Sequence, residues 1–242
     1  LKPKKMDRKE LDEVIEAFVK AAERAIEAGF EALEIHAAHG YLINSFLSPI
    51  SNKRNDEYGG TIENRSKILI DIIKQIRLVI PSNIPLFCRI SAVDGLENGW
   101  SLDDSVKLAK FLSDSGVDCI DCSSGGILGR PRFAATDDGK KLESNLDRGL
   151  GFQVPYADEI KNKANILTMA VGVIVKPSQA ENIIQNNQAD LVAMGREMMY
   201  NPFWSLHAAQ ELNADTDFQM WPEQYKWGVE RRSKITKFKD II

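Results

Sequence analysis

The feature that most constrains the fold is the regular alternation of two patterns along the chain. Short runs of β-branched and apolar residues, typical of buried strands, alternate with longer segments whose apolar residues recur at helical spacing. We expect strands at residues 32–36, 85–90, 119–122, 166–171 and 191–194. We expect helices at residues 7–28, 62–80, 102–115, 154–163, 177–186 and 202–212. This order predicts an α/β fold with parallel strands and crossover helices.

Five expected strands leave two architectures open. An open, doubly wound sheet can have five strands, whereas a closed (βα)8 barrel needs eight. The count alone therefore favours the open sheet. No low-complexity tract and no linker rich in Pro, Gly or Ser interrupts the alternation, so we expect one domain over residues 1–242.

Charge and composition argue against several classes of protein. The 242 residues include 31 basic and 35 acidic ones, a formal net charge of −4, whereas a nucleic-acid-binding chain is typically basic. No apolar run approaches the ~20 residues of a membrane span. The charged first ten residues lack the apolar core of a signal peptide, and three cysteines do not make a disulfide framework. We therefore expect a cytoplasmic protein without nucleic-acid or membrane partners.

Polar residues and glycines cluster directly after each expected strand. Ligands bind at the carboxyl ends of strands in both barrels and open α/β sheets. The five clusters therefore predict one shared site. In strand order they are His36 with His39, then Arg89, then Ser123 to Gly126, then Gly172, and finally Gly195 with Arg196.

The first cluster, His36-Ala-Ala-His39-Gly-Tyr41, combines two imidazoles with a phenol. Neutral imidazole N–H groups can polarise a carbonyl oxygen on which charge develops. Tyr41, with an ordinary pKa of ~10, is a reasonable proton donor to a carbanion. The alternative, that the histidines only satisfy backbone groups in a loop, has equal weight on spacing alone.

A zinc site is an alternative interpretation of the two histidines. His36-x-x-His39 and Cys119-x-x-Cys122 together have the composition of a Cys2His2 set. Residues three apart on a strand point to opposite faces, however, so both cysteines cannot bind one ion. We predict no metal site and assign Cys88, Cys119 and Cys122 to the core.

Arg89 ends an otherwise apolar strand. A guanidinium at the inward end of a strand is costly unless it meets an anion or an electron-rich ligand. An ion pair with Asp94 or Asp121 is the alternative, and we favour a ligand.

Gly172 and Gly195 with Arg196 follow the last two strands. In phosphate-binding barrels the loops after strands seven and eight offer backbone N–H groups to a phosphate, and arginine adds bidentate charge. The chain contains no GxGxxG or GxxxxGK[ST] motif, which argues against a Rossmann or P-loop site.

Several blocks of sequence resemble one known family. The longest are HAAHGYL at 36–42, FLSP at 46–49 and NKRNDEYGGTIENR at 52–65. Shorter ones are FCRIS at 87–91, DCSSG at 121–125, AVG at 170–172, MGRE at 194–197 and NPF at 201–203. Together they resemble the Old Yellow Enzyme family, and most closely its bacterial-type NADPH dehydrogenases, which are FMN ene-reductases. The resemblance extends to about Tyr225.

The resemblance implies a TIM (βα)8 barrel that holds FMN noncovalently at its carboxyl end. Residues 1–225 would supply strands four to eight with their helices, with the first three βα units missing, and residues 226–242 would form a C-terminal tail. His36 and His39, with Ala37 and Ala38 between them, would bind the substrate carbonyl, and Tyr41 would protonate the substrate. Arg89 would contact the flavin, whereas Gly172, Gly195 and Arg196 would bind its phosphate.

The implied reaction uses NADPH or NADH to reduce the C=C bond of an enone or enal through FMN, in an enzyme that is a homo-oligomer. Two alternatives stay open. The chain resembles the barrel of dienoyl-CoA reductase-like enzymes, and a truncated, non-catalytic fragment that binds no FMN would carry the same motifs.

Two loops lie outside the predicted site. Residues 52–65 are dense in charge, but we interpret Arg54, Asp56, Asn64 and Arg65 as structural, with Thr61 capping the next helix. The stretch from Leu128 to Leu150 is rich in charge and glycine, and we expect a loop or lid there.

Overall fold

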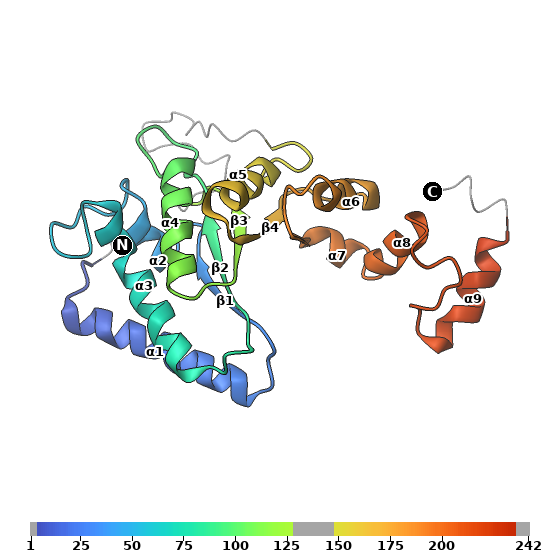
Figure 1. The fold of residues 1–242 in the computed structure, drawn as a ribbon, viewed down its shortest axis with the longest axis horizontal. Coiled ribbons are helices and arrows are strands. Elements are labelled where there is room, and N and C mark those ends of the chain that lie inside the picture. Colours follow the sequence, from blue (N-terminus) through green and yellow to red (C-terminus); the bar gives the residue numbers. More distant parts are fainter. Residues whose placement is uncertain (1–3, 128–147, 236–242) are drawn as a thin grey trace.

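The computed structural model describes residues 4–127 and 148–235, which form five parallel strands and nine helices (Figure 1). The strands are β1 (Leu33–Ala37), β2 (Leu86–Ser91), β3 (Cys119–Ser123), β4 (Leu167–Val171) and β5 (Leu191–Ala193). The predicted helices are α1 (Arg8–Glu27), α3 (Ile62–Val79), α4 (Leu102–Asp114), α5 (Val154–Ala164), α6 (Pro177–Gln185) and α8 (Trp204–Glu211). Every predicted boundary agrees within two residues.

Three helices were not predicted: α2 (Leu42–Leu47), α7 (Arg196–Tyr200) and α9 (Glu223–Ser233). The first two have six and five residues, too few for a helical period to show in the sequence. The third lies at the end of the predicted βα units and extends into the segment assigned to the tail. No described helix is long and apolar enough to cross a membrane.

The strand order is β1-β2-β3-β4-β5, the same as the order along the chain. A doubly wound sheet reverses its order at a switch point, and no reversal occurs here. The open, doubly wound arrangement that the strand count favoured is therefore wrong. Contacts join α1 to α3, α3 to α4 and α4 to α5, so these helices form a continuous layer beside the sheet (Figure 1).

Alternation along the strands separates the sheet into a covered face and an open one. On the covered face, Ile35, Cys88 and Ile120 are buried in the core beneath the helices. On the other face, Leu167 and Leu191 are 54% and 42% exposed. Apolar side chains on this second face therefore remain uncovered by the described residues.

Carboxylates before the strands join neighbouring units at the amino ends of the sheet. Asp118 accepts a hydrogen bond from the backbone N–H of Leu86 at 2.7 Å and pairs with Arg77 of α3. Asp190 accepts from the backbone N–H of Thr168 at 2.9 Å. Both contacts satisfy a backbone donor at the start of a strand, which water would otherwise have to satisfy.

We expect the helix layer to hold much of the stability. Leu108 of α4 is fully buried, whereas Leu78 of α3 is 76% exposed. Leu108→Ala should lower the free energy of unfolding by about 2–5 kcal/mol because it leaves a cavity. Leu78→Ala, the same chemical change on the surface, should stay within about 0.5 kcal/mol of the wild type in urea unfolding. Equal losses would contradict this assignment of the core.

Candidate active site

The histidine cluster forms a compact group at the carboxyl end of β1. His39 and Gly40 have φ values of 60° and 76°, so the chain turns back on itself directly after the strand. The ring centroids of His36 and His39 lie 5.2 Å apart. Tyr41 lies edge-on to His36 at 5.3 Å and is 66% exposed. The fold thus brings the three predicted catalytic side chains together.

Two glycines allow this turn to pack against the loop after β3. A Cβ atom on Gly40 would lie 2.3 Å from the backbone oxygen of Gly126, and one on Gly126 would lie 2.4 Å from the Cα of His39. Both distances are far below any tolerable contact, so only glycine fits at either position. The backbone N–H of His39 also donates to Ser91 Oγ at 2.9 Å. Ends of three neighbouring strands therefore hold the His39 loop.

Both histidines are held in the neutral form near pH 7. Partial burial, the cationic Arg89 and the neighbouring His36, in that order of importance, together lower the pKa of His39 to about 4. The pKa of His36 is also lowered, first by burial and then by Arg89. A neutral imidazole retains one N–H donor, which is what polarisation of a carbonyl oxygen requires.

The alternative role for the histidines was satisfaction of backbone groups. His39 Nε2 instead lies 2.6 Å from Ser123 Oγ, a side-chain partner. Among the described residues, neither ring forms a hydrogen bond to a backbone group. The second nitrogen of His39 and the whole ring edge of His36 therefore remain available to a ligand.

Arg89 and Asp121 lie side by side below the histidines. The strand register pairs His36 with Arg89 and Arg89 with Asp121. Arg89 Nε forms an ion pair with Asp121 Oδ2 at 3.2 Å, but the two atoms are not aligned for a hydrogen bond. Arg89 Nε and Asp121 Oδ1 are both buried and have no hydrogen-bond partner. Burial raises the pKa of Asp121 to about 7, against the lowering effect of Arg89. The ion pair between Arg89 and Asp121, which the sequence offered as an alternative to a ligand, is therefore present. The Nε–H of Arg89 still lacks a hydrogen-bond acceptor.

The glycines after β4 and β5 fit a phosphate group. Gly172 has φ 122°, and a Cβ there would lie 2.9 Å from Gln153 Nε2. Gly195 has open space around its missing Cβ and directly precedes Arg196, whose side chain is exposed. Because β4 and β5 pair, both loops leave the same edge of the sheet. Accessible backbone and a free arginine suit an anionic oxygen cluster.

The sequence did not indicate two features of this edge. Gln153 was not predicted to belong to the site, and Ser124 was predicted only as one of the polar residues after β3, with no specific hydrogen-bond partner. Ser124 Oγ donates to Gln153 Oε1 at 2.6 Å, and Gln153 Nε2 donates to the backbone oxygen of Val171 at 2.9 Å. The available signal was slight: a polar residue directly before the Val-Pro pair that starts α5.

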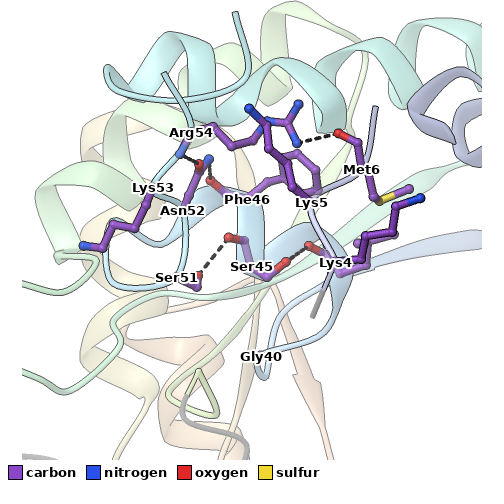
Figure 2. Close-up of a pocket in the computed structure, with 11 residues that line it drawn as sticks. Lys4, Lys5, Met6, Gly40, Ser45, Phe46, Ser51, Asn52, Lys53 and Arg54 are labelled. Carbon is purple, nitrogen blue, oxygen red and sulfur yellow. Dashed lines mark hydrogen bonds between the residues drawn. The ribbon is translucent and has the colours of Figure 1, made fainter. Parts of the chain in front are cut away.

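The charged loop over residues 52–65 has the structural role that was predicted. Arg54 pairs with Asp56 at 2.7 Å. It also donates to the backbone oxygen of Met6 at 2.9 Å, as Figure 2 shows. Asn64 Nδ2 and Arg65 Nε donate to backbone oxygens of this loop and of α2. Thr61 accepts from the N–H of Asn64 at 3.4 Å and caps α3, as predicted.

A hollow of about 490 Å³ borders this loop and reaches Gly40 (Figure 2). Its cationic side chains are already engaged. Lys4 pairs with Glu10 at 2.7 Å, Lys5 pairs with Asp56 at 3.4 Å, and Lys53 donates to a backbone oxygen. The hollow therefore offers no unsatisfied charge beside the histidine cluster.

The three cysteines are free and buried, as predicted for core residues. Cys88 and Cys122 belong to the core beneath the helices, whereas Cys119 faces Phe87 and Leu167 across the strand register. Burial raises the pKa of Cys119 to about 12, which leaves it protonated and unreactive. Among the described residues no group of three His, Cys, Asp or Glu side chains could hold a metal ion. The predicted loop or lid at 128–150 falls almost entirely outside the described residues.

The fold and site define an α/β protein whose candidate ligand site lies at the carboxyl edge of a parallel sheet. The family model for the NADH:flavin oxidoreductase / NADH oxidase family matches residues 1–215. The chain therefore belongs to that family.

Curated relatives agree with this family. An NADPH dehydrogenase of Halalkalibacterium halodurans is 45% identical over 92% of this chain and 60% of its own length. An NADPH dehydrogenase of Bacillus subtilis is 42% identical over 93% of this chain and 61% of its own length. The chain thus spans about 60% of the length of these relatives.

Solved structures show the same fold. A complex of 2-naphthoyl-CoA reductase with 2-naphthoyl-CoA has a TM-score of 0.73 and 25% identity, covering 87% of this chain and 30% of its own. Histamine dehydrogenase from Rhizobium sp. 4-9 has a TM-score of 0.71 and 22% identity, covering 88% of this chain and 29% of its own.

The lowered pKa of His39 predicts a specific loss of stability in mild acid. Between about pH 6.5 and pH 4 the unfolded chain binds a proton at this residue and the folded chain does not. The contribution of His39 is therefore fully present above pH 6.5 and falls as the pH falls through this window. Urea unfolding at pH 7 and pH 4.5 should show a larger acid loss for the wild type than for His39→Gln. The same loss in both proteins would contradict a neutral, buried His39.

Proposed function

We propose that this chain is part of an FMN-dependent oxidoreductase that uses NAD(P)H to reduce the C=C bond of α,β-unsaturated carbonyl compounds. One observation carries the proposal: a neutral histidine pair beside an exposed tyrosine, with Arg89 on the neighbouring strand. The names of the relatives favour NADPH as the reductant.

The residues at the carboxyl edge fit FMN. Gly172, Gly195 and Arg196 would bind its phosphate, because Gly195 has open space where a side chain would lie, Arg196 is exposed, and Gly172 lies in the neighbouring loop. Arg89, whose Nε pairs with Asp121 but forms no hydrogen bond, would meet the part of the flavin ring that gains negative charge. Bound FMN supplies the redox chemistry, since it accepts a hydride from NAD(P)H and delivers one to the substrate.

The histidine cluster would hold and protonate the substrate. His36 and His39, with Ala37 and Ala38 between them, form a wall from which two neutral N–H donors can bind the carbonyl oxygen. These donors stabilise the negative charge that collects on this oxygen as the β-carbon is reduced. Tyr41 would deliver the proton to the α-carbon, which completes the addition of two hydrogens across the double bond.

We infer that the five strands are strands four to eight of a (βα)8 barrel. Their order follows the chain, as barrel strands do, and the exposed Leu167 and Leu191 lie on the face that a barrel would enclose. The outer edges of β1 and β5 are unpaired among the described residues. Three further βα units, or a second copy in a homo-oligomer, would cover them in the cytoplasm.

The non-catalytic alternative also has support from these open edges. A sheet with two unpaired edges and an uncovered apolar face holds a cofactor less firmly than a closed barrel does. The alternative of a dienoyl-CoA reductase-like barrel has no comparable support in the described residues.

Purification with added FMN, removal of the excess and a visible spectrum decide between these alternatives. Retained flavin bands that NADPH bleaches under anaerobic conditions and 2-cyclohexenone restores would support the proposed enzyme. A colourless protein would assign the function to a longer barrel and make this chain a non-catalytic part of it.

The assignment of Arg196 predicts a selective loss of phosphate binding. Arg196→Met should weaken FMN binding about 10- to 100-fold, the effect of a lost charge-assisted hydrogen bond. Riboflavin lacks the phosphate, so its affinity should not change. Fluorescence titration of both flavins measures the two values, and an equal loss for both would place Arg196 away from the phosphate.

The assignment of the histidine cluster predicts a split between the two half-reactions. Tyr41→Phe should slow cyclohexenone reduction about 100-fold or more because the proton donor is lost. Bleaching of bound FMN by NADPH should keep the wild-type rate in stopped-flow measurements. If the oxidative half-reaction is unchanged, the proton has another donor.

A further inference from the structure

The side chain of Gln153 lies between the carboxyl ends of β3 and β4 and joins them. Its Oε1 accepts from Ser124 Oγ at 2.6 Å, and its Nε2 donates to the backbone oxygen of Val171 at 2.9 Å. Gln153 is only 4% exposed. Buried amides are retained where their hydrogen bonds are made, because unmade ones are costly. Both ends of this amide are satisfied by different strands.

The start of α5 leaves this amide free to bridge the strands. Gln153 occupies the N-cap position, yet its side chain makes no capping hydrogen bond. A capping side chain normally satisfies a backbone N–H in the first turn of the helix. Pro155 lies in that turn and has no N–H to satisfy. The helix therefore begins without using the Gln153 side chain.

Hydrogen bonds continue from this bridge to the histidine cluster. Ser91 Oγ donates to the backbone oxygen of Gly125 at 2.7 Å and accepts from the N–H of His39 at 2.9 Å. Gly125 is the neighbour of Ser124 in the chain. A nearly continuous series of contacts thus crosses from the end of β1 through β2 and β3 to Gln153.

The same bridge also reaches the glycine loop after β4. Val171, which accepts from Gln153, directly precedes Gly172, and a Cβ on Gly172 would collide with Gln153 Nε2 at 2.9 Å. The absence of a side chain at Gly172 is therefore what allows the amide to approach the strand end. Gln153 therefore contacts the end of β4, before the loop proposed for the phosphate, and the loop after β3, which packs against the His39 loop through Gly126.

We propose that Gln153 is a positioning residue that holds the His39 loop and the Gly172 loop at a fixed separation. The inference rests on the proposed function, in which one loop binds the substrate carbonyl and the other binds the cofactor phosphate. Reacting groups must be held within about 3–3.5 Å, and a displacement of an ångström is costly in rate. Gln153 touches neither ligand and acts only through the loops it joins.

Gln179 provides a matched control. Its Nε2 donates to the backbone oxygen of Val173 at 3.2 Å, and its Oε1 accepts from the N–H of Val175 at 3.1 Å. It therefore supports the loop after β4 by two hydrogen bonds, whereas Gln153 makes one hydrogen bond to the end of β4 and one to Ser124. It makes no hydrogen bond to the end of β3, so its loss should leave the His39 loop in place.

Amide hydrogen exchange of the whole chain tests the bridge without any ligand. Gln153→Leu and Ser124→Ala should raise exchange about tenfold at the His39 and Gly125 amides, because each removes a bond between the strand ends. Gln179→Leu should raise exchange only near Val175. A change confined to the first turn of α5, or an unchanged His39 amide in both bridge variants, would overturn the proposal. Ser124→Ala keeps the test valid if Gln153→Leu does not fold.

Kinetics of the flavin-loaded protein provide the second measurement. Gln153→Leu should weaken FMN binding and also raise the KM for cyclohexenone, whereas Gln179→Leu should weaken FMN binding alone. The same pattern in both variants would reduce Gln153 to a local support of one loop. Failure of the wild type to bind flavin would instead assign the activity to a longer barrel, and hydrogen exchange alone would then decide the role of Gln153.

Discussion

Parallel pairing in chain order is the constraint on which the rest of this structure depends. Because every strand runs in the same direction, each carboxyl end leaves the same edge of the sheet. The register then sets His36 beside Arg89 and Arg89 beside Asp121, across three strands. Residues separated by 84 positions in the chain, such as His39 and Ser123, come into contact. The chemistry of the edge follows from that adjacency.

Burial and the charge of Arg89 together set the protonation of the groups at this edge. Partial burial disfavours protonation of both His36 and His39, and the positive charge of Arg89 acts in the same direction. Asp121 feels the opposite balance, since burial raises its pKa to about 7 while Arg89 lowers it. Near neutral pH the edge thus combines one cation with two neutral donors, and the nearby carboxylate titrates in the same range. That combination suits an electron-rich ligand whose oxygen gains negative charge.

The open face of the sheet carries apolar side chains that the described residues leave uncovered. Leu167 and Leu191 are exposed on it, while the opposite face is fully covered by helices. Exposed apolar surface of this kind is normally covered in a stable protein. The contacts described at the carboxyl edge do not need the missing cover, because they join adjacent strands. The histidine turn, the Gln153 bridge and the Gly172 loop are therefore complete within the described residues.

The sequence by itself determined the strands, the long helices and the set of polar residues that follow each strand. These are local properties, because periodicity appears within a single segment. The carboxyl ends of parallel strands also lie at the same edge of the sheet whatever the strand order. Strand order, the left-handed turn at His39, the contact between Gly40 and Gly126, and the Gln153 bridge were decided only by the tertiary structure. Each depends on the distance between segments remote in the chain. No local pattern contains that distance, because it arises only when the strands pair and the helices pack.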